Sequence, residues 1–149
     1  MELINMQIRA LLEEPDMIAA LANLSACIKE NYSDLNWAGF YIVRNGELVL
    51  GPFQGRPACT HIPFDRGVCG LTYTSMKPQR IDDVLSFPGH IACDSASRSE
   101  LCVPVIAEGR CVMEIDLDSP LPARFSAQME KEMLQAAEDI ASAYLQHRW

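Results

Sequence analysis

Residues 111–118, Cys-Val-Met-Glu-Ile-Asp-Leu-Asp, alternate between apolar and acidic side chains over most of their length. Successive side chains of a β-strand point to opposite faces, so this alternation predicts a strand with one apolar and one acidic face. The two faces carry Met113, Ile115 and Leu117 on one side and Glu114, Asp116 and Asp118 on the other. Neighbouring carboxylates repel each other, so a dry environment would raise their pKa values. Two interpretations stay open: a solvated edge strand, or a pocket wall that binds a ligand ammonium or keeps one acid protonated.

Helical patterns flank a series of short strand patterns. Apolar stripes predict two N-terminal helices, broken at Glu14-Pro15 and the second capped by Asp16, and a C-terminal helix capped by Ser126. The N-terminal stripes consist of Leu3, Ile4, Ile8, Leu11 and Leu12, and then Ile18, Leu21, Ala22 and Leu24. Strands are expected at 37–43, 48–50, 58–63, 81–84, 100–106 and 111–117, with a loop at 51–57, a short helix at 71–75 and hairpin turns at 44–47 and 108–110. We therefore expect a single α+β domain over residues 1–149, with a mainly antiparallel sheet of roughly six strands flanked by N- and C-terminal helices that pack on one face.

The stretch from Pro88 to Glu100 fits neither a helix nor a strand. Pro88 and Gly89 break regular structure, and the serines and the aspartate that follow favour local backbone bonds. Cys93 lies in the middle of this polar loop, whereas a structural thiol usually lies in an apolar run. Cys93 is therefore a candidate nucleophile, with an inert thiol as the alternative.

The other cysteines have different surroundings. Those that lie in apolar helix or strand patterns, and are expected in the core, are Cys27, Cys102 and Cys111. Cys59 and Cys69 flank the turn before the short helix, and either could approach Cys93 if the loops converge. The chain is longer and less cysteine-rich than a secreted disulfide scaffold, which favours catalytic or redox thiols. It has no Cys-x-x-Cys pair, so we expect neither a structural zinc ion nor any other cofactor.

Two aromatic residues and two histidines are further candidates for a site. Trp37 and Tyr41 are four apart on a predicted strand and therefore share one face, either in the core or as the wall of a pocket for a small cation. His61 and His90 lie close in sequence to candidate cysteines, so a Cys–His hydrolase stays open, although no flanking signature of a thiol protease is present.

The net charge of −8 argues against a nucleic-acid partner, because phosphate binding needs a basic stripe that this chain lacks. No apolar run reaches membrane-spanning length, and the acidic N-terminus lacks the pattern of a signal peptide. We expect a cytoplasmic protein that binds neither nucleic acid nor membrane.

Several motifs occur in the order found in one known family. They are Asn36-Trp-Ala-Gly-Phe-Tyr41, Leu50-Gly-Pro-Phe-Gln-Gly55, Pro57-Ala-Cys59, Arg66-Gly-Val-Cys-Gly70, Gly89-His-Ile-Ala-Cys-Asp-Ser-Ala-Ser-Arg-Ser-Glu100 and Ile115-Asp-Leu-Asp-Ser119. In these motifs the chain resembles the free methionine-(R)-sulfoxide reductases, which are stand-alone GAF-domain enzymes. The resemblance runs from about residue 36 to residue 119.

The resemblance implies a GAF fold and the reduction of free L-methionine-(R)-sulfoxide to methionine, with thioredoxin as reductant and often a homodimer. Position by position, Cys93 matches the catalytic cysteine, Cys59 the usual resolving cysteine and Cys69 a third cysteine of the redox set. The family's pocket acids are matched by Glu100, Asp116 and Asp118, and its aromatic wall by Trp37 and Tyr41. In this chemistry a thiolate attacks the sulfoxide sulfur and an acid protonates the oxygen. The resulting Cys93 sulfenic acid then condenses with Cys59 to a disulfide.

Some residues depart from the family pattern. Met113-Glu114 stands where a small or aliphatic pair is common, and Cys102 and Cys111 are additional thiols. The alternative function is a non-catalytic GAF module that binds a small ligand as a sensor. Such a module has no need for cysteines at all three family positions.

Overall fold

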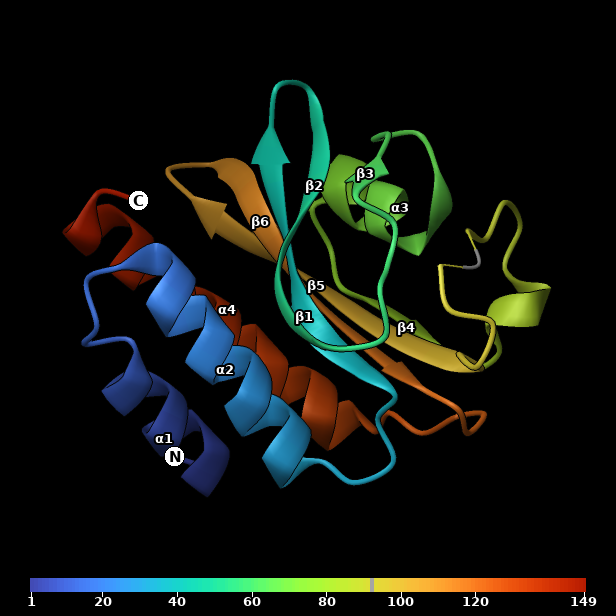
Figure 1. The fold of residues 1–149 in the computed structure, drawn as a ribbon, viewed down its shortest axis with the longest axis horizontal. Coiled ribbons are helices and arrows are strands. Elements are labelled where there is room, and N and C mark those ends of the chain that lie inside the picture. Colours follow the sequence, from blue (N-terminus) through green and yellow to red (C-terminus); the bar gives the residue numbers. More distant parts are fainter. Residues whose placement is uncertain (92) are drawn as a thin grey trace.

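The computed structural model describes residues 1–91 and 93–149, and its centre is a six-stranded sheet (Figure 1). The strand order is β3-β2-β1-β6-β5-β4, and every neighbouring pair is antiparallel. The strands are β1 (Trp37–Arg44), β2 (Glu47–Gly55), β3 (His61–Ile62), β4 (Gln79–Ile81), β5 (Ser99–Ala107) and β6 (Arg110–Ser119). The α+β prediction is confirmed, and the acidic strand β6 is central in the sheet rather than at its edge.

Two tight turns form the hairpins β1–β2 and β5–β6, as predicted. Asn45 and Gly46 have φ angles of 52° and 79°, and Glu108 and Gly109 have φ angles of 51° and 77°. Positive φ at both central residues is the type I′ geometry, whose twist matches that of the flanking strands. The two hairpins then pair with each other through β1 and β6.

The strand β2 is longer than predicted. We expected it to end at Leu50, with a loop from Gly51, but it continues to Gly55. The pairing of β1 with β2 shifts register between Gly39 and Tyr41, where β2 has one residue more than β1, so the bulge lies in β2 itself. A bulge tolerates a proline such as Pro52, which cannot donate to the ladder. Glycine and proline therefore bend this strand instead of ending it.

Two other boundaries also differ from the sequence prediction. The strand expected at 58–63 is only the two-residue β3, and the short helix α3 (Gly67–Ser75) begins four residues earlier than predicted. The segment expected to be extended at 81–84 contains the end of β4 and the start of the 3-10 helix η1 (Val84–Ser86). Short elements with few periodic residues have weak sequence signals.

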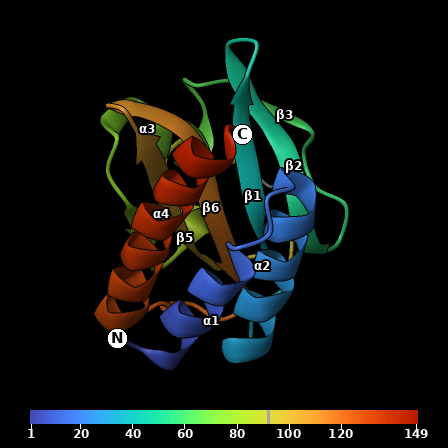
Figure 2. The same ribbon diagram turned by 90° about the vertical axis from the view of Figure 1, so that its left-hand side faces the viewer.

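Three helices lie on one side of the sheet. Two of them, α2 (Met17–Asn31) and α4 (Ala127–His147), pack on the sheet, and α1 (Leu3–Leu11) packs on α2 and α4, as Figure 2 shows. The predicted caps are confirmed, since Asp16 accepts a hydrogen bond from Ala19 N and Ser126 accepts one from Met129 N. The apolar side chains of β6 are fully buried against these helices in the larger core. Some stripe residues were predicted wrongly: Leu3, Ile18 and Ala22 are exposed and Cys27 is only half-buried.

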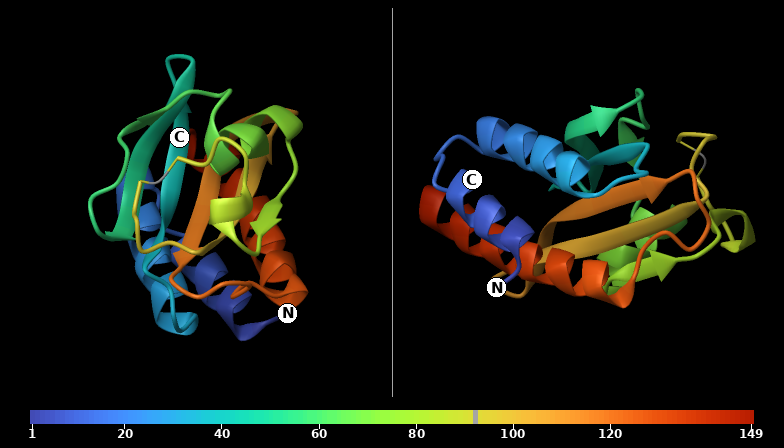
Figure 3. Two further views of the ribbon diagram at one scale, coloured as in Figure 1. Left: turned by 90° about the vertical axis from the view of Figure 1, so that its right-hand side faces the viewer. Right: turned by 90° about the horizontal axis from the view of Figure 1, so that it is seen from below.

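The other face of the sheet is covered by α3, η1 and the loop between η1 and β5 (Figure 3). A second, smaller hydrophobic cluster lies here, and its buried members are Trp37, Tyr41, Leu48, Ile62, Val68, Cys69 and Cys102. Among the residues that the structure describes, no helix has both the length and the apolar composition that crossing a membrane requires. The acidic face of β6 points into this loop-covered half of the molecule.

Gly39 permits the close approach of β1 and β2, which generates a stability prediction. An added methyl group would collide with Cβ of Phe53 and lie 2.9 Å from the carbonyl oxygen of Pro52. We expect Gly39→Ala to lower the free energy of unfolding by about 3 kcal/mol, because backbone atoms cannot move aside as a flexible side chain can. Urea unfolding followed by circular dichroism measures this loss.

Gly51→Ala is the matched control in the paired strand. Its methyl group would be nearest the flexible end of Ile42, at 3.0 Å. We expect this variant to lose at most about 1 kcal/mol. Equal losses in the two variants would contradict the assignment of a specific steric role to Gly39.

Candidate active site

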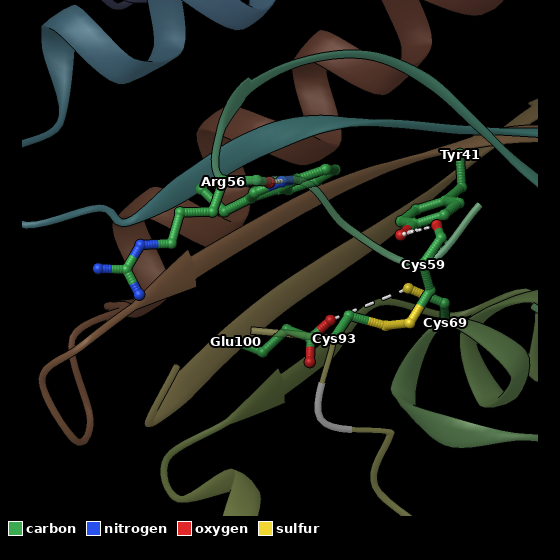
Figure 4. Close-up of a disulfide and its surroundings, with 7 residues drawn as sticks. Tyr41, Arg56, Cys59, Cys69, Cys93 and Glu100 are labelled. Carbon is green, nitrogen blue, oxygen red and sulfur yellow. Dashed lines mark hydrogen bonds between the residues drawn. A yellow bond between two sulfur atoms is a disulfide. The ribbon is translucent and has the colours of Figure 1, made fainter. Parts of the chain in front are cut away.

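A disulfide joins Cys59 to Cys93 across 34 residues of sequence (Figure 4). Cys59 lies on the loop between β2 and β3, and Cys93 lies on the loop between η1 and β5. Their Cα atoms are 5.4 Å apart, within the usual range for a disulfide. The pairing that the family resemblance implied is therefore present.

The aromatic pair on β1 holds the loop that carries Cys59. The rings of Trp37 and Tyr41 are stacked, with centroids 5.9 Å apart. The Trp37 indole N–H donates to the carbonyl oxygen of Arg56 at 3.2 Å, and the Tyr41 hydroxyl donates to that of Cys59 at 2.9 Å. Burial raises the pKa of Tyr41, so its phenol stays protonated as a donor. Both sequence interpretations hold in part, because Trp37 and Tyr41 are core residues and Tyr41 also lines a cavity.

The loop that carries Cys93 is held by Asn36, a residue that the sequence reasoning did not single out. The Asn36 amide donates hydrogen bonds of 3.0 Å to both the Asp94 carboxylate and the Ser97 hydroxyl. Within the loop, Asp94 also accepts a hydrogen bond from Ala96 N at 2.9 Å, a local bond of the kind that its polar sequence predicted. An asparagine before a strand gives no sequence signal for this long-range role.

A cavity of about 40 Å³ lies between the disulfide and β6. It is lined by Cys93, Cys69, Tyr41, Glu100, Asp116 and Asp118, together with residues 62, 66–68, 90–91, 94 and 97. The structure thus brings together all the predicted site residues except Trp37, which supports the wall from behind, and Cys59, which forms the disulfide. The solvated-edge interpretation of the acidic strand is wrong, because β6 is central in the sheet, Asp116 is buried and Asp118 is largely enclosed, and these two residues line the cavity.

The carboxyl groups in the cavity are crowded and poorly solvated. Burial, followed by the charges of Asp116 and Asp118, raises the pKa of Glu100 well above its usual range. Burial and the Asp116 charge likewise raise the pKa of Asp118 well above its usual range. Burial also raises the pKa of Asp116, but hydrogen bonds from Glu100 and Cys69 oppose this rise. Asp116 is therefore the carboxyl that ionises most readily, while Glu100 retains its proton.

A second group of polar side chains lies deeper, below the cavity. The Cys69 thiol is 3.9 Å from Glu100 Oε2 and 3.8 Å from the Cys102 sulfur, and the Cys102 thiol donates to Glu114 Oε1 at 3.3 Å. Cys102 and Glu114 are fully buried, and Cys69 is 5% exposed. Cys102 is in the core, as predicted, but its neighbours are polar. Burial raises the pKa of Glu114 well above its usual range, and its Oε2 atom has no hydrogen-bond partner among the described residues.

Among the residues that the structure describes, two sets of donor atoms have the spacing to hold a metal ion: Cys69, Cys102 and Asp116, and separately Glu100, Asp116 and Asp118. The donor atoms of each set lie within 4.8 Å of one another. Bound protons explain the close approach of these groups as well as a metal ion would. The thiols of the first set, and Glu100 and Asp118 of the second, have raised pKa values and therefore tend to stay protonated.

The two candidate histidines have different environments. His90 lines the cavity, and burial lowers its pKa, so it is neutral near pH 7. His61 is exposed on β3 and contacts the Glu47 carboxylate at 2.6 Å. In the described part of the chain, no hydrogen bond joins either histidine to a cysteine, as a Cys–His hydrolase would require.

Comparison with known proteins agrees with this geometry. The family model of the GAF domain matches residues 16–144. Protein YtsP of Bacillus subtilis strain 168 is 49% identical over 148 residues, covering 97% of this chain and 91% of that protein. The free methionine-R-sulfoxide reductase of Escherichia coli K12 is 44% identical over 127 residues, covering 85% of this chain and 77% of that protein.

The solved structures show the same similarity. The structure of free methionine-R-sulfoxide reductase from Neisseria meningitidis in complex with its substrate has a TM-score of 0.94 and 40% sequence identity. The match covers 97% of this chain and 88% of that one. The resemblance found in the sequence is thereby confirmed, and the chain belongs to the GAF domain family and, within it, to the family of the free methionine-R-sulfoxide reductases.

Proposed function

We propose that this protein reduces free L-methionine-(R)-sulfoxide to L-methionine, with Cys93 as nucleophile and Cys59 as resolving cysteine. The observation that carries the proposal is the Cys59–Cys93 disulfide beside a cavity walled by three carboxyl groups. The names of the relatives from Escherichia coli and Neisseria meningitidis, both at least 40% identical, support the same activity and substrate.

The reaction needs a soft nucleophile and an acid on opposite sides of the sulfoxide group. The Cys93 thiolate attacks the sulfoxide sulfur, and Glu100 donates its proton to the oxygen. Methionine leaves and Cys93 becomes a sulfenic acid, which condenses with the Cys59 thiol to give the disulfide and water. Glu100 suits the role of acid because it lines the cavity with Cys93 and its raised pKa keeps it protonated at neutral pH.

The remaining carboxyl groups suit the recognition of a free amino acid. Asp116 and Asp118 line the cavity beside Glu100, and Asp116 has an oxygen without a hydrogen-bond partner among the described residues. An ammonium group of the substrate would supply both the missing donor and the positive charge that the buried Asp116 carboxylate needs. A methionine sulfoxide within a peptide has no such ammonium, which explains a preference for the free amino acid.

The cycle closes when an external dithiol reduces the disulfide, and we expect thioredoxin in this role. Cys59 and Cys93 are both partly exposed, so a dithiol can attack this bond without a large rearrangement. We also expect a cytoplasmic, single-domain homodimer. The side chains of Leu3 and Met6 lie one turn apart on α1 and are exposed, which is consistent with a contact between two copies of the chain.

A sensor without turnover would leave the disulfide unexplained. Ligand recognition by the carboxyl groups and Tyr41 needs no bond between two loops. A hydrolase would need a base that is hydrogen-bonded to Cys93. Among the described contacts, His90 makes no such hydrogen bond.

The first test is product formation from each sulfoxide epimer. We expect the purified protein with dithiothreitol to form methionine from the R epimer and not from the S epimer. Replacing the nucleophile in Cys93→Ser should lower the rate by at least about a thousandfold, whereas Cys27→Ser is the matched control with an unchanged rate. Chromatography of methionine measures both, and persistent turnover in Cys93→Ser would refute the assigned nucleophile.

The second test separates the nucleophile from the resolving cysteine. Cys59→Ser should retain one fast turnover but lose thioredoxin-driven cycling by at least about a hundredfold, because thioredoxin reduces disulfides and none forms with Cys93. Rapid-quench and steady-state measurements give the two rates. Unimpaired cycling would assign the resolving role to Cys69.

The third test concerns the acid. Activity should rise as Cys93 ionises and then fall at alkaline pH, as Glu100 loses the proton that it retains above the usual range of a carboxyl pKa. We expect Glu100→Gln to lower kcat by about a hundredfold or more and to remove the alkaline decline. Glu138→Gln, on the exposed side of α4, is the control. An unchanged pH profile of kcat in Glu100→Gln would exclude Glu100 as the acid.

A further inference from the structure

We propose that Cys69 and Cys102 form a second redox pair, which takes over the oxidation state of the Cys59–Cys93 disulfide and frees Cys93 for another turnover. The proposal rests on the proposed function, because that reaction produces the first disulfide. It gives a role to two buried groups that the reductase mechanism does not use, Cys102 and Glu114.

The two thiols already lie in contact. Cys69 on α3 and Cys102 on β5 have their sulfur atoms 3.8 Å apart, and both side chains are buried. The two sulfur atoms of a disulfide are about 2 Å apart. The sulfur atoms must therefore approach each other by about 2 Å, which side-chain rotation can achieve. Cys111, the other buried strand cysteine, instead donates to the carbonyl oxygen of Met113 at 3.4 Å.

Cys69 connects this pair to the first disulfide. It lines the same cavity as Cys93, and it belongs to the hydrophobic cluster against which Cys59 packs. Figure 4 shows Cys69, the disulfide and Glu100 in one view, with a dashed line from the Cys69 thiol to the Glu100 carboxyl group, to which it donates. The cysteines therefore form a chain that leads from the loops to the centre of the sheet.

Glu114 gives Cys102 a proton acceptor. Its Oε1 atom accepts a hydrogen bond from the Cys102 thiol at 3.3 Å, and its Oε2 atom has no hydrogen-bond partner among the described residues. A fully buried carboxyl without a cation is costly, so its presence on β6 is difficult to explain by packing. Burial raises the pKa of Glu114 well above its usual range, so its carboxylate form is a stronger base for this proton than an exposed carboxylate would be.

The transfer is a pair of thiol–disulfide exchanges. The Cys69 thiolate attacks the Cys59 sulfur, so the Cys59–Cys69 bond forms, the Cys59–Cys93 bond breaks and Cys93 leaves as a thiolate. Cys102 passes its proton to Glu114 and attacks the Cys69 sulfur, so the Cys69–Cys102 bond forms and Cys59 leaves. Cys93 takes up the proton that Cys69 lost, and Glu114 returns the Cys102 proton, through solvent, to the departing Cys59 thiolate, so Glu114 ends as it began. No oxidant is consumed, because one disulfide is exchanged for another.

The consequence is that each chain holds a second dithiol, and therefore a second pair of electrons for sulfoxide reduction. After the exchange, Cys59 and Cys93 are again thiols, and a second sulfoxide can be reduced before any external dithiol arrives. A fully reduced chain should then yield two methionines and end with two disulfides.

The test counts both products in the absence of reductant. Fully reduced, desalted enzyme is mixed with excess methionine-(R)-sulfoxide and quenched in acid, and methionine and disulfide-linked peptides are quantified. We expect two methionines per chain, with Cys59–Cys93 and Cys69–Cys102 peptides, in wild type and in Cys111→Ala. In Cys102→Ala we expect half the methionine and a single disulfide. Glu114→Gln should slow the second methionine at least about tenfold while leaving the rate of the first unchanged.

A wild-type yield of one methionine with a single disulfide would overturn the second pair and leave the reductase assignment intact. Equal yields in wild type and Cys102→Ala would also overturn it. If no variant forms methionine, the proposed function fails, and the pair is tested directly by one equivalent of diamide, a thiol oxidant, added to the reduced wild-type protein. A Cys69–Cys102 peptide is then expected, and oxidation confined to Cys59–Cys93 would refute the pair.

Discussion

Because β6 is central in the antiparallel sheet, its side chains determine the character of both halves of the molecule. Its side chains alternate between faces, so one strand supplies apolar residues to the helix-covered core and carboxyl groups to the loop-covered face. A shift of one residue in the pairing of β6 with β1 would exchange these faces and bury the acidic residues under the helices. The two type I′ turns fix the register within each hairpin, and the burial of the apolar face of β6 fixes its register with β1. The fold and the site thus depend on the same register.

The site contains features that an ordinary core would not tolerate. Glu100, Glu114 and Asp116 are almost inaccessible to solvent, and burial opposes the ionisation of each. A protein that served only stability would replace them with apolar residues of similar volume. In the proposed mechanism these groups have a use that offsets the loss of stability, because a protonated and an ionised carboxyl group side by side would supply an acid and an anion.

The sequence predicted the parts of the fold that have a clear periodicity or a specific turn. Both hairpin turns, the two helix caps and the two faces of β6 follow from short patterns, and the family motifs identified the cysteines and the carboxyl groups. The extension of β2 through Pro52 was not predictable, because it depends on a bulge in β2 that only its pairing with β1 defines. The roles of Asn36 and of the Cys102–Glu114 contact were also missed, since both arise from residues that are distant in sequence or that read as ordinary strand positions. Exposed residues such as Ile18 misled the stripe analysis, because a helix packed on a sheet buries a narrower face than its apolar residues suggest.

The cross-link between Cys59 and Cys93 closes a loop of 34 residues that includes β3, α3, β4 and η1. Closing a loop of this length restricts the unfolded chain and is worth about 4 kcal/mol in the chain-entropy description. The protein therefore changes its resistance to unfolding once in every catalytic cycle, with the reduced form the more easily unfolded. In a cell short of reductant, the oxidised molecules would be the ones that proteases spare, so the pool of enzyme would persist until electrons become available again.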